Sequence, residues 1–328
     1  MTTGQDRVFV EAPARLHFGV LDLRGSRGRW FGGIGAAVSA PTMLLSACAA
    51  ATLEVAGDNG DRAAEFARRF VASHRIRGGA RLCVHRSLPP HAGLGSGTQL
   101  ALSVGRAIAE LHGIDVDAPA LARVMARAGR SAIGTWTFAG GGLVVEGGRR
   151  AGSSLDEVAP LIARLDFPPS WRCIVVVPNA PARMSGAAEA AAFAALPPPP
   201  EREVERVAHL VLMVLLPSVA DADLVGFGAA LSAIQAITGG WFAPVQGGTF
   251  APGPSEAIVR RMAEWGAVGV GQSSWGPTVY GIVDGEEAGL RLADRVHAAL
   301  GADGAVYVGP FRSEGARVWR GGQKIPAQ

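Results

Sequence analysis

The sequence predicts a protein of two mixed α and β domains. Segments with strand-like and helical spacing alternate along the whole chain of 328 residues, an order typical of helices packed against sheets. A chain of this length suggests one large or two ordinary domains. Pro168-Pro169 ends a connector region over residues 156–169. We therefore expect a first domain over residues 1–168 and a second over residues 169–328.

The first domain is predicted to open with strands and to continue with helices and strands in turn. Short apolar runs predict strands at residues 8–11, 34–38, 43–47, 52–55, 81–87 and 143–145. Helices are expected at residues 61–74, from the end of a glycine-rich loop to Leu111, and after Asp117, which stands two residues before a proline. Gly113 is the predicted stop of the second helix, and the connector is expected to hold a short helix.

The second domain is predicted to hold a buried strand, a group of helices and a closing alternation of strand and helix. The strand is expected at residues 173–177, and helices at residues 186–195, 203–216, 224–238 and 255–265. The prolines at 197–200 form a stiff spacer between the first two of these helices. The closing elements are expected at residues 268–271, 278–283, 286–300 and 305–308.

Composition excludes several classes of function. The formal net charge of +3 is too small for a nucleic-acid-binding surface, and the basic residues are scattered. Lys324 is the only lysine, so a cationic phosphate contact in the folded body must come from an arginine or a metal. The three cysteines are far apart in the sequence, which argues against a zinc site or a disulfide framework and fits a reducing compartment.

No segment of the sequence predicts export or membrane insertion. Residues 1–7 are polar and lack the apolar core of a signal peptide. The most apolar run, residues 210–216, ends at a proline and is far too short to span a bilayer. We therefore expect a cytoplasmic protein without a membrane or nucleic-acid partner.

A glycine-rich loop that runs from a strand into a helix is the most informative local signal. Residues 89–99 read PPHAGLGSGTQ. The start of a helix has unpaired N–H groups and a positive dipole end, and glycines let those groups approach phosphate oxygens. The pattern fits neither a Walker loop nor a dinucleotide fingerprint. We interpret the loop as a phosphate cradle formed by Gly93, Leu94, Gly95, Ser96, Gly97 and Thr98; the alternative is a turn that only caps the helix.

Three separate segments resemble the motifs of the GHMP kinase superfamily, the small-molecule kinases of galactose, homoserine and mevalonate. PARLHFG at residues 13–19 resembles the opening motif, residues 90–98 the phosphate loop, and GQSSWGPT at residues 271–278 the C-terminal glycine-rich motif. The resemblance implies an α+β, GHMP-kinase-like fold, in which a domain like domain 2 of ribosomal protein S5 precedes a ferredoxin-like domain with inserted helices. The ligand would lie between the two domains.

At two positions, the sequence differs from that of the kinases in this superfamily. Gly134 stands where those kinases have a catalytic aspartate, and the loop ends Ser-Gly-Thr instead of with two adjacent serines. These departures resemble one branch, the β-ribofuranosylaminobenzene 5′-phosphate synthases of methanopterin biosynthesis. Residues 14–23, 29–35, 129–134 and 271–278 look like that branch. Residues 138–141, FAGG, depart from it because more polar residues are expected there.

The resemblance implies a reaction between phosphoribosyl pyrophosphate and 4-aminobenzoate or 4-hydroxybenzoate. Pyrophosphate and carbon dioxide leave, and a carbon–carbon bond joins the ring to the sugar. The group expelled from the ring is carbon dioxide and not a proton, so that step needs no base, which agrees with Gly134. The site has to stabilise the departing pyrophosphate, hold the ring and exclude water. Mg²⁺ is expected from the pyrophosphate donor, and the branch is compatible with a homodimer.

The same resemblance suggests which residues form the site. Arg15, His17 and Asp22 are the expected catalytic residues, and strand alternation places the first two on one side of the chain. Asp22 would hold Mg²⁺ or steady the sugar cation, or would simply cap a turn. Arg130 and Ser131 are expected to bind phosphate, or Arg130 only complements a helix dipole.

The third motif is expected to supply the rest of the substrate site. Ser273 and Ser274 suit anion contacts, and Trp275 would stack on the benzoate ring or belong to the core. Phe31 and Trp136 are further candidates for the ring wall. Two alternatives to the synthase remain open: an ATP-dependent GHMP kinase, and a non-catalytic protein that senses a phosphorylated ligand.

Overall fold

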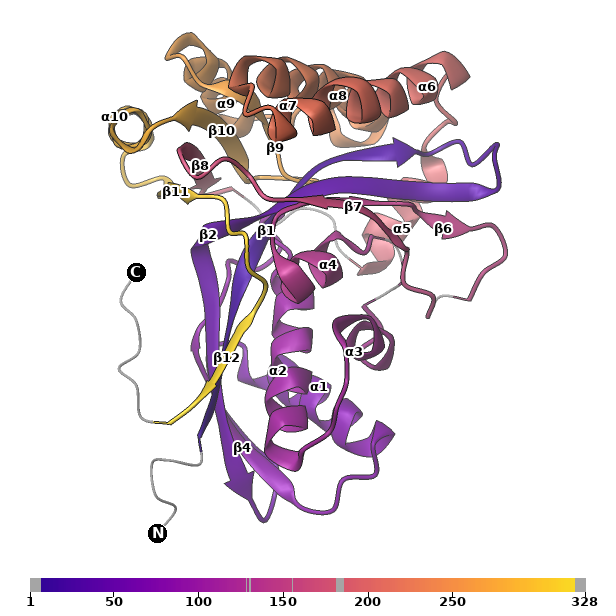
Figure 1. The fold of residues 1–328 in the computed structure, drawn as a ribbon, viewed down its shortest axis with the longest axis vertical. Helices are drawn as coiled ribbons and strands as arrows, with labels where there is room; N and C mark the ends of the chain where they lie inside the picture. The colour runs from indigo at the N-terminus through magenta and orange to yellow at the C-terminus, as the bar shows by residue number, and fades with distance from the viewer. Residues whose placement is uncertain (1–6, 128, 130, 155, 181–185, 322–328) are drawn as a thin grey trace.

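Two sheets with helices packed on them build the molecule (Figure 1). The computed structural model describes residues 7–321 apart from residues 128, 130, 155 and 181–185. Within these residues, one sheet has eight strands and the other has four. The predicted boundary at residue 168 falls between the last strand that enters the large sheet from the N-terminal half and the first strand of the small sheet.

The large sheet is built on two long antiparallel strands. Its central order is β12-β1-β2-β4-β3, and β5, β6 and β7 extend it beside β2. The strands are β1 (Val8–Asp22), β2 (Arg29–Ala50), β3 (Glu54–Gly57), β4 (Gly79–Arg86), β5 (Leu143–Glu146), β6 (Arg149–Arg150), β7 (Leu161–Leu165) and β12 (Arg317–Arg320). Helices α1 (Gly60–Ser73), α2 (Ser96–His112) and α4 (Ile133–Gly140) pack against it, and α3 (Ala118–Val124) packs on these three helices.

Local sequence explains where the helices of this half begin and end. Gly95 and Gly113 bracket α2 in left-handed conformations, which glycine adopts without strain. The Asp117 side chain accepts a hydrogen bond from the N–H of Ala120 at 2.7 Å and so caps α3. The apolar face of α2, which includes Leu100, packs into the core that α1 and β1 share.

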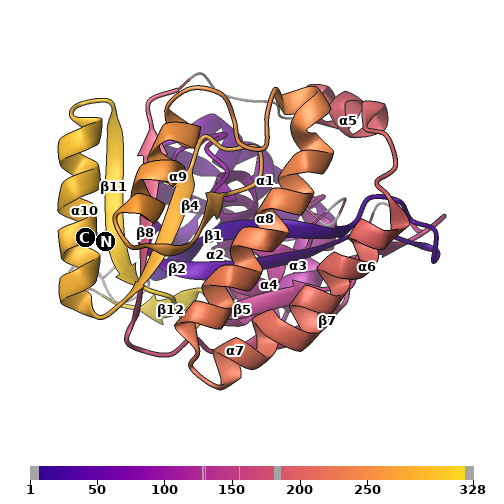
Figure 2. The ribbon, with the colours of Figure 1, turned by 90° about the horizontal axis from the view of Figure 1, so that it is seen from above.

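The small sheet has the order β11-β8-β10-β9 and carries helices on both faces. Its strands are β8 (Trp171–Pro178), β9 (Val268–Gln272), β10 (Val279–Asp284) and β11 (Gly304–Pro310). The helices of this half are α5 (Gly186–Ala195), α6 (Glu201–Leu210), the π-helical turn η2 (Val211–Leu215), α7 (Leu216–Ala220), α8 (Leu224–Gln246), α9 (Pro254–Glu264) and α10 (Glu286–Leu300). Helices α9 and α10 form one small core with the sheet, whereas α8 covers the side that faces β1 (Figure 2).

The chain returns to the large sheet at its C-terminal end. Strand β12 pairs antiparallel with β1, so that Val8 faces Arg320 and Glu11 faces Arg317. Residues from both ends of the described chain therefore belong to the same sheet.

Several elements differ from the sequence expectations. The predicted short helix in the connector is wrong, because residues 161–165 form β7, an edge strand in which exposed Ile162 alternates with less exposed neighbours. The predicted strands at 34–38 and 43–47 are parts of the single strand β2, which passes Pro41 where the register with β1 shifts. The sequence analysis missed α4, β6 and β12; all three are short, and β6 and β12 depend on pairing with a distant strand.

Helix α8 is the one described helix whose length and apolar composition would suit a membrane span. It is longer than the predicted segment at 224–238 because it continues through Pro244 to Gln246. In this structure α8 packs on β9 and β1, and Phe227, Leu231 and Ile234 are buried in the core. Its apolar composition is thus explained by packing between the two sheets.

Candidate active site

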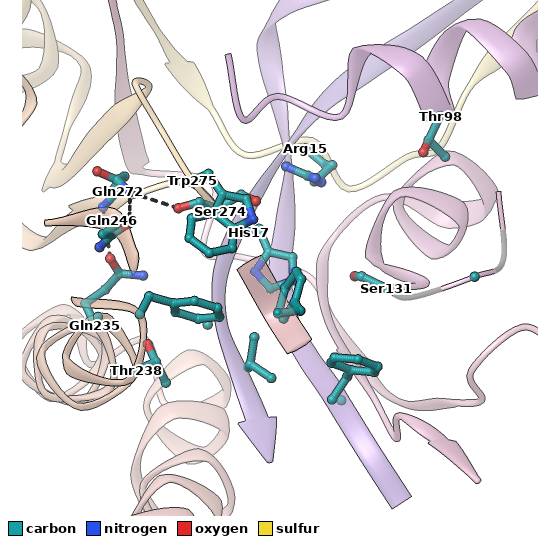
Figure 3. A pocket seen from close by; sticks show the side chains of 18 of the residues that line it. Arg15, His17, Thr98, Ser131, Gln235, Thr238, Gln246, Gln272, Ser274 and Trp275 are labelled. Atoms are coloured by element: carbon teal, nitrogen blue, oxygen red, sulfur yellow. Dashed lines mark hydrogen bonds between the residues drawn. The ribbon is translucent and has the colours of Figure 1, made fainter. Parts of the chain in front are cut away.

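A cavity of about 290 Å³ lies between the two halves of the molecule. Strand β1, the start of α2, the middle of α8 and the turn after β9 surround it. Figure 3 shows Thr98 and Ser131 on one side, Gln235 and Thr238 on the other, and Arg15, His17 and Trp275 between them. The cavity is therefore where segments distant in sequence meet, as the three motifs predict.

Strand alternation delivers Arg15 and His17 to the cavity. Leu16 and Phe18 point into the core and are fully buried, while Arg15 and His17 line the cavity and are partly exposed. The prediction that both lie on one side of the strand agrees with this arrangement. Burial and then the charge of Arg15 lower the pKa of His17 to about 3. The imidazole is therefore neutral at physiological pH.

The glycine-rich loop is fixed to the opening and closing motifs by its own carbonyl groups. The Gly93 carbonyl accepts hydrogen bonds from Arg15 Nη1 at 2.5 Å and from Ser273 Oγ at 2.6 Å. The Leu94 carbonyl accepts from the Arg15 N–H at 3.1 Å. At Gly93, φ is +84°, and a Cβ would lie 2.2 Å from the Ser273 carbonyl oxygen. The carbonyl groups of Gly93 and Leu94 thus join the glycine-rich loop to β1 and to the turn after β9, and these two residues do not line the cavity.

Arginine side chains converge on the first turn of α2. A Cβ built on Gly95 would lie 2.8 Å from Arg15 Cγ. One built on Gly97 would lie 2.5 Å from Arg62 Nη2 and 3.1 Å from Arg127 Nη2. Arg127 also donates to Thr98 Oγ1 through Nε and Nη2, both at 3.3 Å. The glycines make room for three guanidinium groups at the positive end of the helix.

Only one residue of the predicted cradle lines the cavity, namely Thr98. Ser96 opens instead into a much smaller hollow beside Arg62. The sequence analysis did not single out Arg62, in α1, or Arg127, in the segment after α3, because neither stands in a motif. It favoured Arg130, which lies outside the described residues, while its neighbour Ser131 lines the cavity.

The two serines of the third motif have different positions. Ser273 is fully buried; its Oγ accepts from the His17 N–H at 2.9 Å while donating to Gly93, so it connects β1 to the loop. Ser274 lines the cavity with φ +57°, a conformation held by a hydrogen bond from its N–H to the His17 carbonyl at 3.3 Å. Of the pair, Ser274 is the one placed to contact a ligand.

Aromatic rings form one part of the cavity wall. Trp275 is only 7% exposed, yet it lines the cavity. Its ring centroid is 4.9 Å from that of Phe242 and 5.5 Å from that of Phe193, both edge to face. Phe31 meets Phe193 at 5.6 Å in the same manner. A flat ring could bind against these faces and edges. Trp136, the other candidate, instead donates to the Ala159 carbonyl away from the cavity.

Metal-ligating side chains do not gather in the described part of the structure. That part contains no group of three or more His, Cys, Asp or Glu side chains placed to share a metal. Asp22 Oδ1 accepts from the N–H groups of Arg24 and Gly25 at 2.6 and 2.9 Å, so it caps the turn after β1. No carboxylate appears among the described residues that line the cavity. Positive charge in this part of the structure comes from arginines, which suits anionic substrates.

Comparisons with known proteins agree with this arrangement. Residues 60–142 match the family "GHMP kinases N terminal domain", and residues 215–302 match "GHMP kinases C terminal". A β-ribofuranosylphenol 5′-phosphate synthase from Archaeoglobus fulgidus is 35% identical, with 94% of this chain and 98% of the relative covered. One from Methanothermobacter thermautotrophicus is 32% identical over the same shares of the two chains. This chain belongs to the β-ribofuranosylphenol 5′-phosphate synthase family.

Solved structures show the same fold across this superfamily. Homoserine kinase from Cytophaga hutchinsonii superimposes with a TM-score of 0.71 over 97% of this chain and 99% of its own, at 16% identity. Mevalonate pyrophosphate decarboxylase from Streptococcus pyogenes gives a TM-score of 0.69 over 95% and 99% of the two chains, at 15% identity. The predicted GHMP-kinase-like α+β fold and the predicted synthase branch are thereby confirmed.

Proposed function

We propose that this protein joins phosphoribosyl pyrophosphate to 4-hydroxybenzoate and releases pyrophosphate and carbon dioxide. The relatives are named for a ribofuranosylphenol product, which corresponds to the hydroxy acid and not to the amino acid. The structural observation that supports the reaction itself is a cavity with arginines at the α2 end, an aromatic wall, and no carboxylate among its described lining residues.

The cationic part of the site suits the donor. As pyrophosphate leaves, negative charge grows on its bridging oxygen, and Arg15 and Arg127 lie where they can balance it. The helix dipole of α2 adds to this field. Any Mg²⁺ would bind as a complex with the pyrophosphate group of the donor, because the described residues contain no cluster of three or more side chains that could ligate it. The sugar carbon then carries positive charge. No carboxylate among the described lining residues could attack this carbon in place of the ring.

The aromatic part suits the acceptor ring. Trp275 and Phe242 meet edge to face and can hold a benzoate ring flat against the sugar carbon. These apolar side chains also keep out water, which would otherwise capture the sugar cation. A Cβ on Gly134 would lie 3.0 Å from Thr98 Cγ2, so the structure has little room for the aspartate that the kinases carry there. This agrees with a reaction in which carbon dioxide, not a proton, leaves the ring carbon.

The proposal is tested by product analysis. Purified protein, phosphoribosyl pyrophosphate, Mg²⁺ and 4-hydroxybenzoate labelled in the carboxyl group should release labelled carbon dioxide and pyrophosphate in equal amounts. Mass spectrometry should show the phenol C-riboside phosphate. Parallel reactions with 4-aminobenzoate, and with ATP plus homoserine or mevalonate, compare the other ring acid and the kinase alternative. A folded protein that releases no carbon dioxide with either ring acid would overturn the proposal.

A further inference from the structure

Glu146, at the end of β5, is a buried carboxyl group that the reaction described above does not use. The residue is fully buried. Its Oε2 accepts a hydrogen bond from the Gly148 N–H at 2.7 Å, whereas Oε1 has no hydrogen-bond partner among the described residues. Burying a carboxyl group with an unsatisfied oxygen is unfavourable, so a functional reason for it is worth seeking.

Gly33 on β2 leaves a gap between this carboxyl group and the active-site imidazole. A Cβ built on Gly33 would lie 3.0 Å from Glu146 Oε1 and 3.4 Å from His17 Nε2. The third neighbour of that point is apolar, Ile133 Cγ1 at 3.1 Å. The free carboxyl oxygen and the ring nitrogen therefore face the same small space. The two groups are not hydrogen-bonded to each other in the structure, but His17, which lines the cavity, is the cavity residue that Glu146 Oε1 faces across this gap.

Burial and nearby charges shift the pKa values of Glu146 and His17 in opposite directions. Burial raises the pKa of Glu146 to about 7, against the smaller opposing effects of the Gly148 and Ala132 amides and the Arg29 guanidinium. Arg15 is the charged group that acts on His17, whose lowered pKa keeps the ring neutral. A neutral imidazole has one donor and one acceptor nitrogen, so it can pass a proton on without holding the charge.

We propose that Glu146 takes up the para-hydroxyl proton of the acceptor through His17 during ring attack and returns it during decarboxylation. This inference rests on the proposed function. As the ring carbon bonds to the sugar, the sugar–pyrophosphate bond breaks, and the hydroxyl proton moves to one nitrogen of His17. The proton on the other nitrogen moves to the Glu146 carboxylate, after the two side chains have closed the Gly33 gap to hydrogen-bond distance. The ring is then a neutral dienone.

The second half of the sequence reverses the proton transfer. The bond to the carboxylate breaks, carbon dioxide leaves, and the electron pair restores the aromatic ring. The phenolate oxygen regains its proton from Glu146 through His17, so no proton is consumed overall. The missing kinase aspartate is thus no contradiction: the ring carbon needs no base, whereas the hydroxyl group opposite it does. Glu146 is a positioning residue in this scheme because it acts through His17.

Glu146→Gln is the decisive variant, since the amide keeps the shape and can still accept from Gly148. With 4-hydroxybenzoate we expect kcat to fall roughly 100-fold, within the range for lost acid–base assistance, with KM for the sugar donor unchanged. The wild-type rate should rise through pH 7, and this rise should vanish in the variant. With 4-aminobenzoate, whose nitrogen can donate electrons while keeping its protons, the loss should be smaller. Glu146→Asp should restore part of the pH dependence.

Controls separate this inference from the proposed function. Glu264→Gln, a change of an exposed carboxyl on α9, should behave like the wild type. Wild-type protein that makes no product from either acid would overturn the function itself. Active wild type together with a Glu146→Gln variant of equal kcat and unchanged pH profile would overturn the relay alone. If that variant does not fold, the pH–rate profiles of the wild type with the two ring acids are compared. The rate with 4-hydroxybenzoate must rise more steeply near pH 7 than the rate with 4-aminobenzoate; identical profiles reject the relay.

Discussion

Arg127 is the residue that most directly links the start of α2 to a ligand charge. Its guanidinium contacts Thr98 Oγ1 and lies over Gly97, beside Arg62. Arginine forms strong, directional hydrogen bonds to phosphate oxygens, and a helix start attracts the same anion. The two effects act on one point of the cavity, so this side chain should matter for binding the donor and little for binding the ring.

Arg127→Ala should weaken binding of phosphoribosyl pyrophosphate roughly 10- to 100-fold, the range for one charged hydrogen-bonding group. Calorimetric titration of the donor measures the effect, and titration of 4-hydroxybenzoate should show a much smaller change. Arg291→Ala, on the exposed surface of α10, is the matched control. Donor affinity equal to that of the control would rule out a donor contact for Arg127.

Glu146 also predicts how stability changes with pH. Its folded pKa of about 7 lies above the ordinary value of 4.5, so the folded state holds a proton that the unfolded state has lost between these values. Stability therefore falls as pH rises from about 4.5 to 7, by about 3 kcal/mol in total. Glu146→Gln removes this dependence. Urea unfolding at pH 5 and pH 8 measures the free energy of unfolding of both proteins. The stability of the variant relative to the wild type should be greater at pH 8 than at pH 5; an equal difference at both pH values would disprove the raised pKa.

Sequence reasoning identified those active-site residues that stand within a motif. Arg15, His17, Thr98, Ser131, Ser274 and Trp275 all line the cavity. Sequence reasoning did not identify Arg62, Arg127 or Glu146. Their positions at the site result from packing between elements, and no local sequence pattern marks them. Gly93 and Ser273 were recognised as motif residues, but their position differs from expectation: they bond to each other and do not line the cavity.

At the scale of elements, the junction of the glycine-rich loop with the turn after β9 holds the two halves in place. Gly93 and Ser273 share a hydrogen bond at 2.6 Å, and the Thr278 N–H donates to the Ala92 carbonyl at 3.2 Å. The position of β1 relative to α2 depends on this junction, because Ser273 also bonds to the backbone of His17.

Gly93→Ala should destabilise the protein by about 2–4 kcal/mol, because it combines left-handed strain with a clash against the Ser273 carbonyl. Gly113→Ala is the matched control: φ is +64° there too, but a Cβ would meet nothing within 4 Å. Urea unfolding of both variants separates strain from clash. Equal losses would mean that the contact with Ser273 contributes little.

Element boundaries were well predicted where capping residues mark them and poorly where long-range pairing sets them. Gly113 and Asp117 end α2 and begin α3 as expected. The strand β7 was mistaken for a helix, since its five residues gain their conformation from pairing with β5. Sequence periodicity cannot show which distant strand a short segment will join.

For the whole molecule, Glu11 ties the C-terminal segment to the large sheet. This buried carboxylate lies within 3.1 Å of Arg86 Nη2, 2.7 Å of Arg317 Nη2 and 3.6 Å of Arg312 Nη1. Burial lowers the pKa of Arg312, and the Glu11 charge opposes that effect. Removing the carboxylate would leave three arginines facing one another in a cleft.

Glu11→Gln should therefore destabilise the protein by about 3 kcal/mol, as expected for a buried ion pair that loses one partner. Thermal unfolding at low and high salt measures the change, and salt should partly rescue the variant by screening the arginines. Glu54→Gln, which breaks the exposed pair with Arg81, should change little. A Glu11 variant as stable as the Glu54 variant would contradict this account.

The pairing of β12 with β1 makes the order of the chain partly interchangeable. Val8 and Arg320 are neighbours across one ladder, so a short peptide could connect them covalently. New ends could then be opened at Gly152, in a turn where added atoms would meet nothing within 4 Å. Such a circular permutant would keep every wall of the cavity, because the cavity depends on contacts between segments and not on the order in which those segments follow one another along the chain.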